Sequence, residues 1–230
     1  MKRISVSMIA MLLVLFGGIQ AYAFPILAYT NVAGKGNQAF GGDIALVFTV
    51  NSGITVVEMG VYDNLGAAKV PTGTNVTVGI YTVPCTLPNF LTCAGTLVPG
   101  TSVTFASGQT YTAVGGDLLD TITPVFLAPG NYEVVAVGFN ANFKNGVYNS
   151  SPYANSFTGS PYLTADGSSF SAHGTLQFTN TNPNANTIYD AGTLDFGPTP
   201  TPEPGTLLLM GTGVLGLAGM VRSKFRKCVS

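Results

Sequence analysis

Residues 131–139, with the sequence NYEVVAVGF, are apolar on both of the faces that a β-strand would present. Successive side chains of a strand point to opposite sides of the sheet. One face of this stretch therefore carries Val134, Ala136 and Gly138, and the other carries Glu133, Val135, Val137 and Phe139. Because both faces are mainly apolar, both have to be covered, and the stretch predicts a strand in the centre of a sheet.

Runs of the same kind recur along the chain, separated by turn residues such as Asn51-Ser52-Gly53 and Pro129-Gly130. They predict further strands at Ile44–Val50, Ile54–Tyr62, Asn75–Thr82, Ser102–Phe105, Ile122–Leu127 and Thr175–Phe178. No segment between Phe24 and Phe196 shows a convincing 3.6-residue period, which would indicate an amphipathic helix. We therefore expect an all-β fold over residues 24–197, as an antiparallel β-sandwich or jelly roll.

The composition excludes two classes of protein. With 46% hydrophobic residues in a chain of 230, there is enough apolar material for a sizeable core, which excludes general disorder. Between Phe24 and Pro200 there are three lysines, no arginine and nine acidic residues, and three minus nine gives a net charge of −6. Such a segment repels phosphate, so we expect no nucleic-acid partner.

The first 23 residues have the pattern of a signal peptide. Lys2 and Arg3 precede an apolar run from Ile4 to Ile19, and Ala21-Tyr22-Ala23 places small residues where signal peptidase requires them. We expect cleavage after Ala23 and export of the residues that follow. The predicted β-sandwich is therefore an ectodomain.

A second apolar run, Thr206–Val221, lies near the C-terminus and predicts a short transmembrane helix. Its 16 residues would extend about 24 Å as a helix, less than the roughly 30 Å of a bilayer core. The basic residues that follow are expected to keep residues 222–230 in the cytoplasm; they are Arg222, Lys224, Arg226 and Lys227. A buried core helix and an ordinary stop-transfer anchor are the alternatives.

A proline-rich linker, residues 198–205, connects the predicted sandwich to this run and contains Pro202-Glu203-Pro204. The triplet, the glycine-interrupted apolar run and the basic end together resemble the PEP-CTERM sorting signal of Gram-negative bacteria, which the protease-like membrane enzyme exosortase recognises. The resemblance implies that the triplet is the recognition and processing site and that the helix holds it at the membrane. Thr201 stands where the family usually has valine. Two prolines also keep Glu203 in an extended, accessible segment.

The glycines of the apolar run suggest contact with another membrane helix. Small residues let helices approach closely in lipid, and Thr212 and Gly216 form a small-xxx-small pair. The alternative is the general enrichment of glycine in membrane helices. In the predicted ectodomain, the stretches NSGITVVEMGVYDNLG, VTVGIYT and FLAPGNYEVVAVGF more loosely resemble the β-sandwich ectodomains common among PEP-CTERM proteins.

Cys85 and Cys93 are the only cysteines in the segment expected outside the cytoplasm. Exported proteins meet an oxidising environment, so a local disulfide is the leading interpretation. It would close a ring of nine residues and stabilise the fold by about 2.5 kcal/mol in the chain-entropy model. A metal site would need more soft ligands than two, and Cys228 lies beyond the membrane run.

The sequence contains no convincing catalytic motif. His173 lies near Ser168, Ser169 and Ser171, but no nucleophile-elbow pattern and no obvious third member accompany it, so a structural or surface role is expected. Isolated carboxylates leave two alternatives open. Glycoside hydrolysis would use Asp117 or Asp120 with Glu58, Asp63 or Glu133. Calcium would be bound by Asp43, Asp63, Asp117, Asp120 and Asp166, although no known calcium-loop spacing is present.

Carbohydrate is a more compatible partner than nucleic acid, because aromatic rings stack on sugar faces while hydroxyl and amide groups bond their rims. The candidate contacts lie in residues 145–170, which we expect to form long loops over one end of the sandwich: Tyr148, Tyr153 and Tyr162, with Phe157 and Phe170 beside them. The alternative is that these rings only pack the loops down. We expect a non-catalytic surface or matrix protein without metal or cofactor, associated with exopolysaccharide; a secreted carbohydrate-active hydrolase is the alternative.

Overall fold

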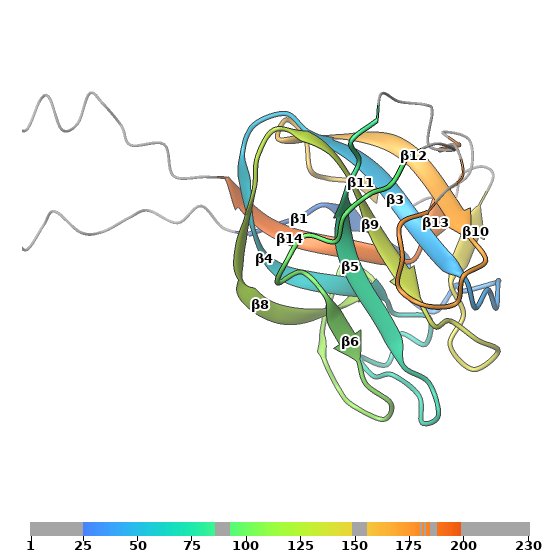
Figure 1. Cartoon of the computed structure of the whole chain (residues 1–230). Helices are drawn as coiled ribbons and strands as arrows, with labels where there is room; N and C mark the ends of the chain where they lie inside the picture. The colour runs from blue at the N-terminus through green and yellow to red at the C-terminus, as the bar shows by residue number, and fades with distance from the viewer. Residues whose placement is uncertain are drawn as a thin grey trace, which may run out of the picture. The chain divides into compact units, whose positions relative to one another are not determined.

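The structure, a computed structural model, describes residues 25–85, 93–148, 156–179, 181, 183–184 and 188–198. All regular secondary structure in these residues is β-structure, and every strand pair is antiparallel. The described residues belong to one compact unit, which contains all of these strands (Figure 1). The predicted all-β antiparallel fold is confirmed.

Two five-stranded sheets form this unit. The first has the order β12-β3-β9-β5-β6. Its strands are β3 (Asp43–Val50), β5 (Val76–Thr82), β6 (Val103–Phe105), β9 (Gly130–Val137) and β12 (Leu163–Ser171). The second has the order β1-β14-β4-β8-β7. Its strands are β1 (Ile26–Leu27), β4 (Ile54–Tyr62), β7 (Thr112–Val114), β8 (Asp117–Leu127) and β14 (Gly192–Pro198).

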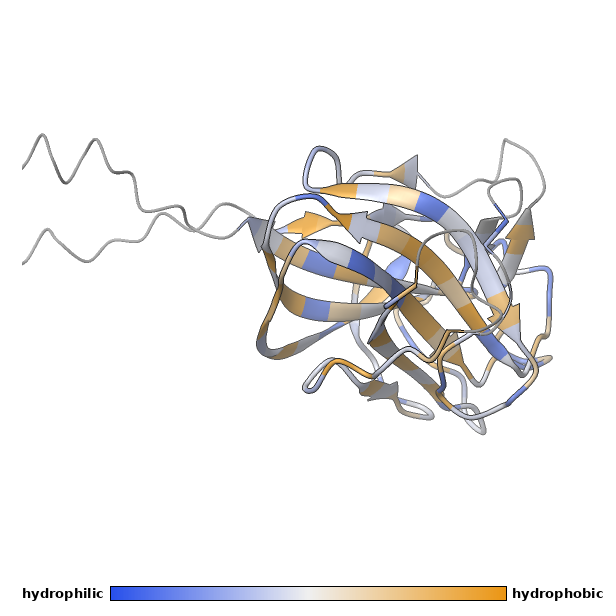
Figure 2. Cartoon of the chain, turned by 45° about the horizontal axis from the view of Figure 1, so that its top comes forward, coloured by the Kyte–Doolittle hydropathy of each residue, from blue (hydrophilic) through white to orange (hydrophobic). Residues whose placement is uncertain are grey.

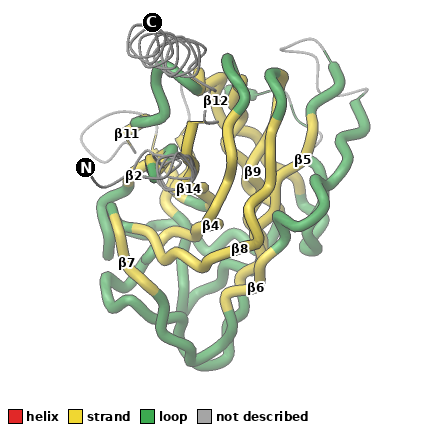
Figure 3. The backbone as a smooth tube through the Cα atoms, turned by 90° about the vertical axis from the view of Figure 1, so that its left-hand side faces the viewer, coloured by secondary structure: helices red, strands yellow, loops and turns green. Residues whose placement is uncertain are grey.

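Two short ribbons complete the described strands. Figure 3, with strands in yellow and loops in green, shows β2 and β11 of the first, and Figure 1 shows β10 and β13 of the second. One pairs β2 (Tyr29–Thr30) with β11 (Ser156–Phe157). The other pairs β10 (Gly146–Tyr148) with β13 (Ile188–Asp190). No helix that could cross a membrane is found among the described residues. The predicted signal peptide, residues 1–23, and the predicted span, Thr206–Val221, lie outside them.

The two sheets share one hydrophobic core. Fully buried side chains come from the inner faces of both: Phe48, Ile80, Val134 and Ala136 from the first sheet, and Met59, Leu118, Leu194 and Phe196 from the second. Figure 2 shows the corresponding hydrophobic segments, in orange, along the strands. Burial of such side chains, with about 1.5–3 kcal/mol from each of the large ones, is the main source of stability of the unit.

The central position predicted for residues 131–139 is confirmed, but the strand is shorter. β9 pairs with β3 on one side and β5 on the other, and it ends at Val137. Gly138 follows at φ +107°, and a Cβ atom there would lie 2.2 Å from the Asn75 carbonyl oxygen. This left-handed conformation ends the strand's alternation, so Phe139 enters the main core rather than the opposite face predicted for it.

Two further predictions are wrong. Thr175–Phe178 is not a strand; Leu176 and Phe178 instead cover the outer face of the first sheet. Residues 145–170 are not all loop, since they include β10, β11 and most of β12. β12 was obscured by its glycine and serine content and by the irregular register between Ala165 and Gly167.

Candidate functional site

The outer face of the first sheet is covered by two irregular segments. Ala45, Tyr81 and Val135 are buried beneath Leu97, Leu176 and Phe178. Next to them Val47 and Val83 are buried beneath Phe178 and the two cysteines. The structure joins these cysteines, Cys85 and Cys93, by a disulfide. The side chains of the central strand that point away from the main core are therefore also removed from water.

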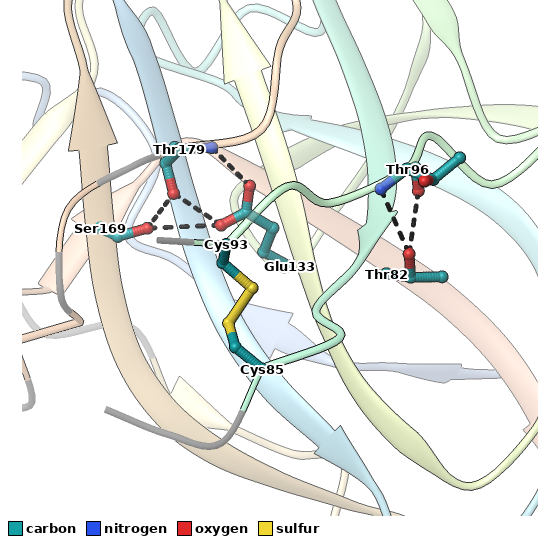
Figure 4. Close-up of a disulfide and its surroundings, with 7 residues drawn as sticks. All are labelled: Thr82, Cys85, Cys93, Thr96, Glu133, Ser169 and Thr179. Atoms are coloured by element: carbon teal, nitrogen blue, oxygen red, sulfur yellow. Dashed lines mark hydrogen bonds between the residues drawn. A yellow bond between two sulfur atoms is a disulfide. The ribbon is translucent and has the colours of Figure 1, made fainter. Parts of the chain in front are cut away.

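Glu133 is one of these side chains, and it is fully buried. Its Oε1 accepts a hydrogen bond from the Thr179 amide at 2.7 Å, and its Oε2 accepts one from Thr179 Oγ1 at 2.6 Å. Ser169 Oγ donates to Oε2 at 3.4 Å, as Figure 4 shows beside the disulfide. Burial outweighs these donors and raises the pKa of Glu133 from 4.5 to about 8. Through its hydrogen bonds to Thr179, Glu133 therefore holds the covering segment against the central strand of the sheet.

Asp43 holds the same segment at a second point. Its carboxylate accepts from Ser171 Oγ at 3.0 Å and from the Gln177 amide at 3.3 Å, and it lies 3.3 Å from His173 Nδ1. Burial raises the pKa of Asp43, and these hydrogen bonds and the histidine oppose the rise.

A serine, a histidine and an aspartate thus come together, but not as a catalytic relay. Ser171 Oγ lies 2.9 Å from His173 Nδ1, the same ring nitrogen that faces Asp43. In a catalytic triad, serine and aspartate use opposite nitrogens of the ring, so that a proton can pass through it. The arrangement fits the structural role expected for His173.

The candidate sugar-contact aromatics occupy different environments. The Tyr162 ring packs edge-on against Phe196 with the ring centroids 6.0 Å apart, and Phe157 lies 5.2 Å from Tyr29; both pack on the core. Phe170 is 45% exposed on β12. Tyr153 and the side chain of Tyr148 lie outside the described residues.

Phe170 belongs to a surface group of three rings. Phe40 and Tyr189 meet it edge to face, with centroids 6.0 and 6.2 Å away. The backbone of Phe170 is fixed as well, because its amide donates to Thr181 Oγ1 and its carbonyl accepts from the same hydroxyl. An exposed ring held in this way suits stacking on a planar or sugar ligand.

The carboxylates considered for hydrolysis or calcium do not all gather at one place. Both Asp63 oxygens cap a turn by accepting from the amides of Leu65, Gly66 and Ala68. Asp166 accepts from Thr49 Oγ1. Glu58 accepts from Thr121 and lies directly opposite Asp195 in the second sheet. No three His, Cys, Asp or Glu side chains of the described residues are arranged to hold a metal ion.

Sequence reasoning missed three polar residues with unusual surroundings. Neither oxygen of Asp190, which is 1% exposed, has a hydrogen-bond partner in the described structure, and one oxygen each of Asp195 and Asn31 is similarly buried and unpartnered. Burial raises the pKa of Asp190 to about 7, and burial with the Glu58 charge raises that of Asp195 to about 6. The sequence feature that could have pointed to them is a single aspartate between less polar neighbours, as in Tyr189-Asp190-Ala191.

The C-terminal segment of the chain matches a known family motif. Residues 200–223 match the PEP-CTERM protein-sorting motif. The chain carries a PEP-CTERM motif. The match includes Pro202-Glu203-Pro204 and Arg222, whereas Lys224, Arg226 and Lys227 follow it; all lie outside the described residues. No curated protein matches the sequence. The PEP-CTERM protein-sorting motif supports export of the protein to the cell envelope, and it carries no information about what the β-unit binds.

Proposed function

We propose that the chain is a non-catalytic cell-surface or matrix protein, sorted through its PEP-CTERM motif and associated with exopolysaccharide. In this proposal residues 24–197 form the β-sandwich ectodomain, and residues 206–221 hold it at the membrane until exosortase acts at Pro202-Glu203-Pro204. The motif match at residues 200–223 is the observation that carries the proposal.

The association with polysaccharide is supported by the group of Phe40, Phe170 and Tyr189. An exposed aromatic face held by its neighbours loses little conformational entropy when a sugar stacks on it. The net negative charge of the β-unit favours a neutral or cation-bridged polysaccharide over a strongly anionic one.

Binding of the exported protein to exopolysaccharide purified from the same cells tests this association. Phe170→Ala should weaken binding at least fivefold. Phe126, which is 56% exposed on β8 of the other sheet, gives the matched control Phe126→Ala, expected to bind as wild type does. Equal binding by wild type and Phe170→Ala would show that the aromatic group is not the contact. If wild type does not bind, the proposed association with exopolysaccharide is wrong.

One observation favours a secreted carbohydrate-active hydrolase as the second candidate. Glu58 and Asp195 lie directly opposite each other on neighbouring strands, and the raised pKa of Asp195 is a property of general acids. Polysaccharide that releases reducing ends with wild type but not with Glu58→Gln would support this candidate. Binding without any change in polymer length supports the non-catalytic proposal.

A further inference from the structure

One end of the second sheet collects buried oxygen atoms from three distant parts of the chain. The Tyr62 amide donates to the Ala191 carbonyl at 2.8 Å, and the Asp63 amide donates to the Gly116 carbonyl at 3.0 Å. These bonds bring the start of β14 and the start of β8 to opposite sides of the end of β4. They thereby bring Asp190 and Asp117 to the same end of the sheet.

Asn31 comes to this end from the segment after β2, because its amide donates to the Gly115 carbonyl at 2.6 Å. Its side-chain Nδ2 donates to Asp117 Oδ1 at 2.5 Å. The remaining oxygens, Asn31 Oδ1 and Asp117 Oδ2, are buried and have no hydrogen-bond partner in the described structure. Asp117 is 0% exposed.

Asp190 supplies the independent observation that points to a ligand. It is 1% exposed, and neither of its carboxyl oxygens has a hydrogen-bond partner among the residues that the structure describes. Asp190 directly precedes Ala191, whose carbonyl accepts from the Tyr62 amide, and Tyr62 pairs with Asp117 in the sheet. The Asp63 oxygens are occupied by turn amides, which leaves Asn31, Asp117 and Asp190 with unused oxygens.

Buried carboxyl oxygens without donors are costly, since a buried charge requires a partner ion or a proton. We propose that Asn31, Asp117 and Asp190 bind a calcium ion that holds this end of the second sheet together. Ca²⁺ accepts carboxylate, amide and water oxygens in flexible geometry, and two carboxylates balance its charge. Fewer than three acidic ligands are needed because the amide oxygen and water complete the shell. The site is independent of the proposed polysaccharide association.

Calorimetric titration of the exported protein with Ca²⁺ at pH 7.5, after treatment with EDTA, tests the proposal. We expect one ion per chain and a higher unfolding temperature in calcium than in EDTA. Asp190→Asn should lower the calcium affinity at least tenfold. Asp195→Asn makes the same change at another buried strand aspartate, which is 9% exposed and lies opposite Glu58, and should leave the affinity within twofold of wild type.

Three results would overturn the proposal. The first is that wild type shows neither binding heat nor a change of unfolding temperature with calcium. This result does not depend on whether any variant folds. The second is an equal loss of affinity in Asp190→Asn and Asp195→Asn, which would indicate diffuse attraction to a negative surface. The third is that Asp190→Asn is more stable than wild type and that calcium changes the stability of neither protein. This would mean that protons, and not a cation, neutralise the buried carboxylates.

Discussion

The Glu133→Gln substitution isolates the energetic effect of one buried carboxyl in the centre of the first sheet. Glutamine has the shape of a protonated glutamate. It can still accept from the Thr179 amide through its oxygen and donate to Thr179 Oγ1 through its amide group. We expect the variant to fold with the same covering segment, while the titration of residue 133 disappears.

The sign of the pH effect follows from the raised pKa. Folded Glu133 has a pKa of about 8 in place of 4.5. Below pH 4.5 both the folded and the unfolded chain hold the proton, and the stabilisation is fully present. Between pH 4.5 and 8 the unfolded chain releases the proton and the folded chain keeps it, so the free energy of unfolding falls as the pH rises. Linkage over this window gives a loss of about 3 to 4 kcal/mol between pH 5 and pH 8.

Urea unfolding of the wild type and Glu133→Gln at pH 5, 6.5 and 8, under non-reducing conditions, measures this loss. Other buried carboxyls, including Asp43 and Asp195, contribute a pH dependence common to both proteins. The wild type should therefore lose more stability than the variant, and the difference should grow with pH. Parallel curves would refute the reasoning, because they would mean that Glu133 is ionised in the folded protein and that its three hydrogen bonds outweigh burial.

Three further predictions concern the covering segments and the backbone. Replacing both Cys85 and Cys93 by serine should lower the free energy of unfolding by about 2.5 kcal/mol in urea, and non-reducing peptide mapping that finds both wild-type thiols free would contradict the bridge. Reduction of the disulfide should also lower the pKa of Glu133, because it loosens the segments that cover the outer face of the first sheet. If the pH dependence of the free energy of unfolding differs between wild type and Glu133→Gln by the same amount before and after reduction, that link is refuted. Gly138→Ala should lower the free energy of unfolding by about 1–3 kcal/mol more than Gly73→Ala does. Both glycines have positive φ, but only position 138 is crowded, by the Asn75 carbonyl. Equal decreases of the unfolding temperature in the two variants would contradict this.

The parts of the fold that could be predicted are those with a strong local signal. The strands at Ile44–Val50, Ile54–Tyr62 and the centre of β9 are rich in β-branched and apolar residues, and such runs have few alternatives in a chain without helical periodicity. β12 and β14 were missed because glycine, serine and aspartate interrupt their pattern. Their positions are set by pairing with β3 and β4 rather than by propensity.

The candidate sites also divide into those with a local signal in the sequence and those that depend on how the strands pair. The cysteine pair was predictable because its members are close in sequence and export sets the redox environment. Asp117 and Asp190 are brought to one end of the sheet only by the pairing of β4 with β8 and β14, and Asn31 joins them through its amide bond to the Gly115 carbonyl. The pattern of one sequence does not encode that proximity. Similarly, Thr179 is a partner of Glu133 only because the chain folds back over the sheet instead of forming a strand there.

The central claim is that the PEP-CTERM motif is read as a sorting signal. Intact-mass measurement of the C-terminus, for wild type and Glu203→Ala recovered from fractionated host cells, tests it most directly. Glu203 lies outside the apolar run, so both chains should reach the membrane. The account predicts that wild type is shortened near Pro202-Glu203-Pro204 while Glu203→Ala keeps its tail through Ser230. A wild-type chain that retains Ser230, or a variant processed as efficiently as wild type, would contradict it and leave the segment as an ordinary anchor.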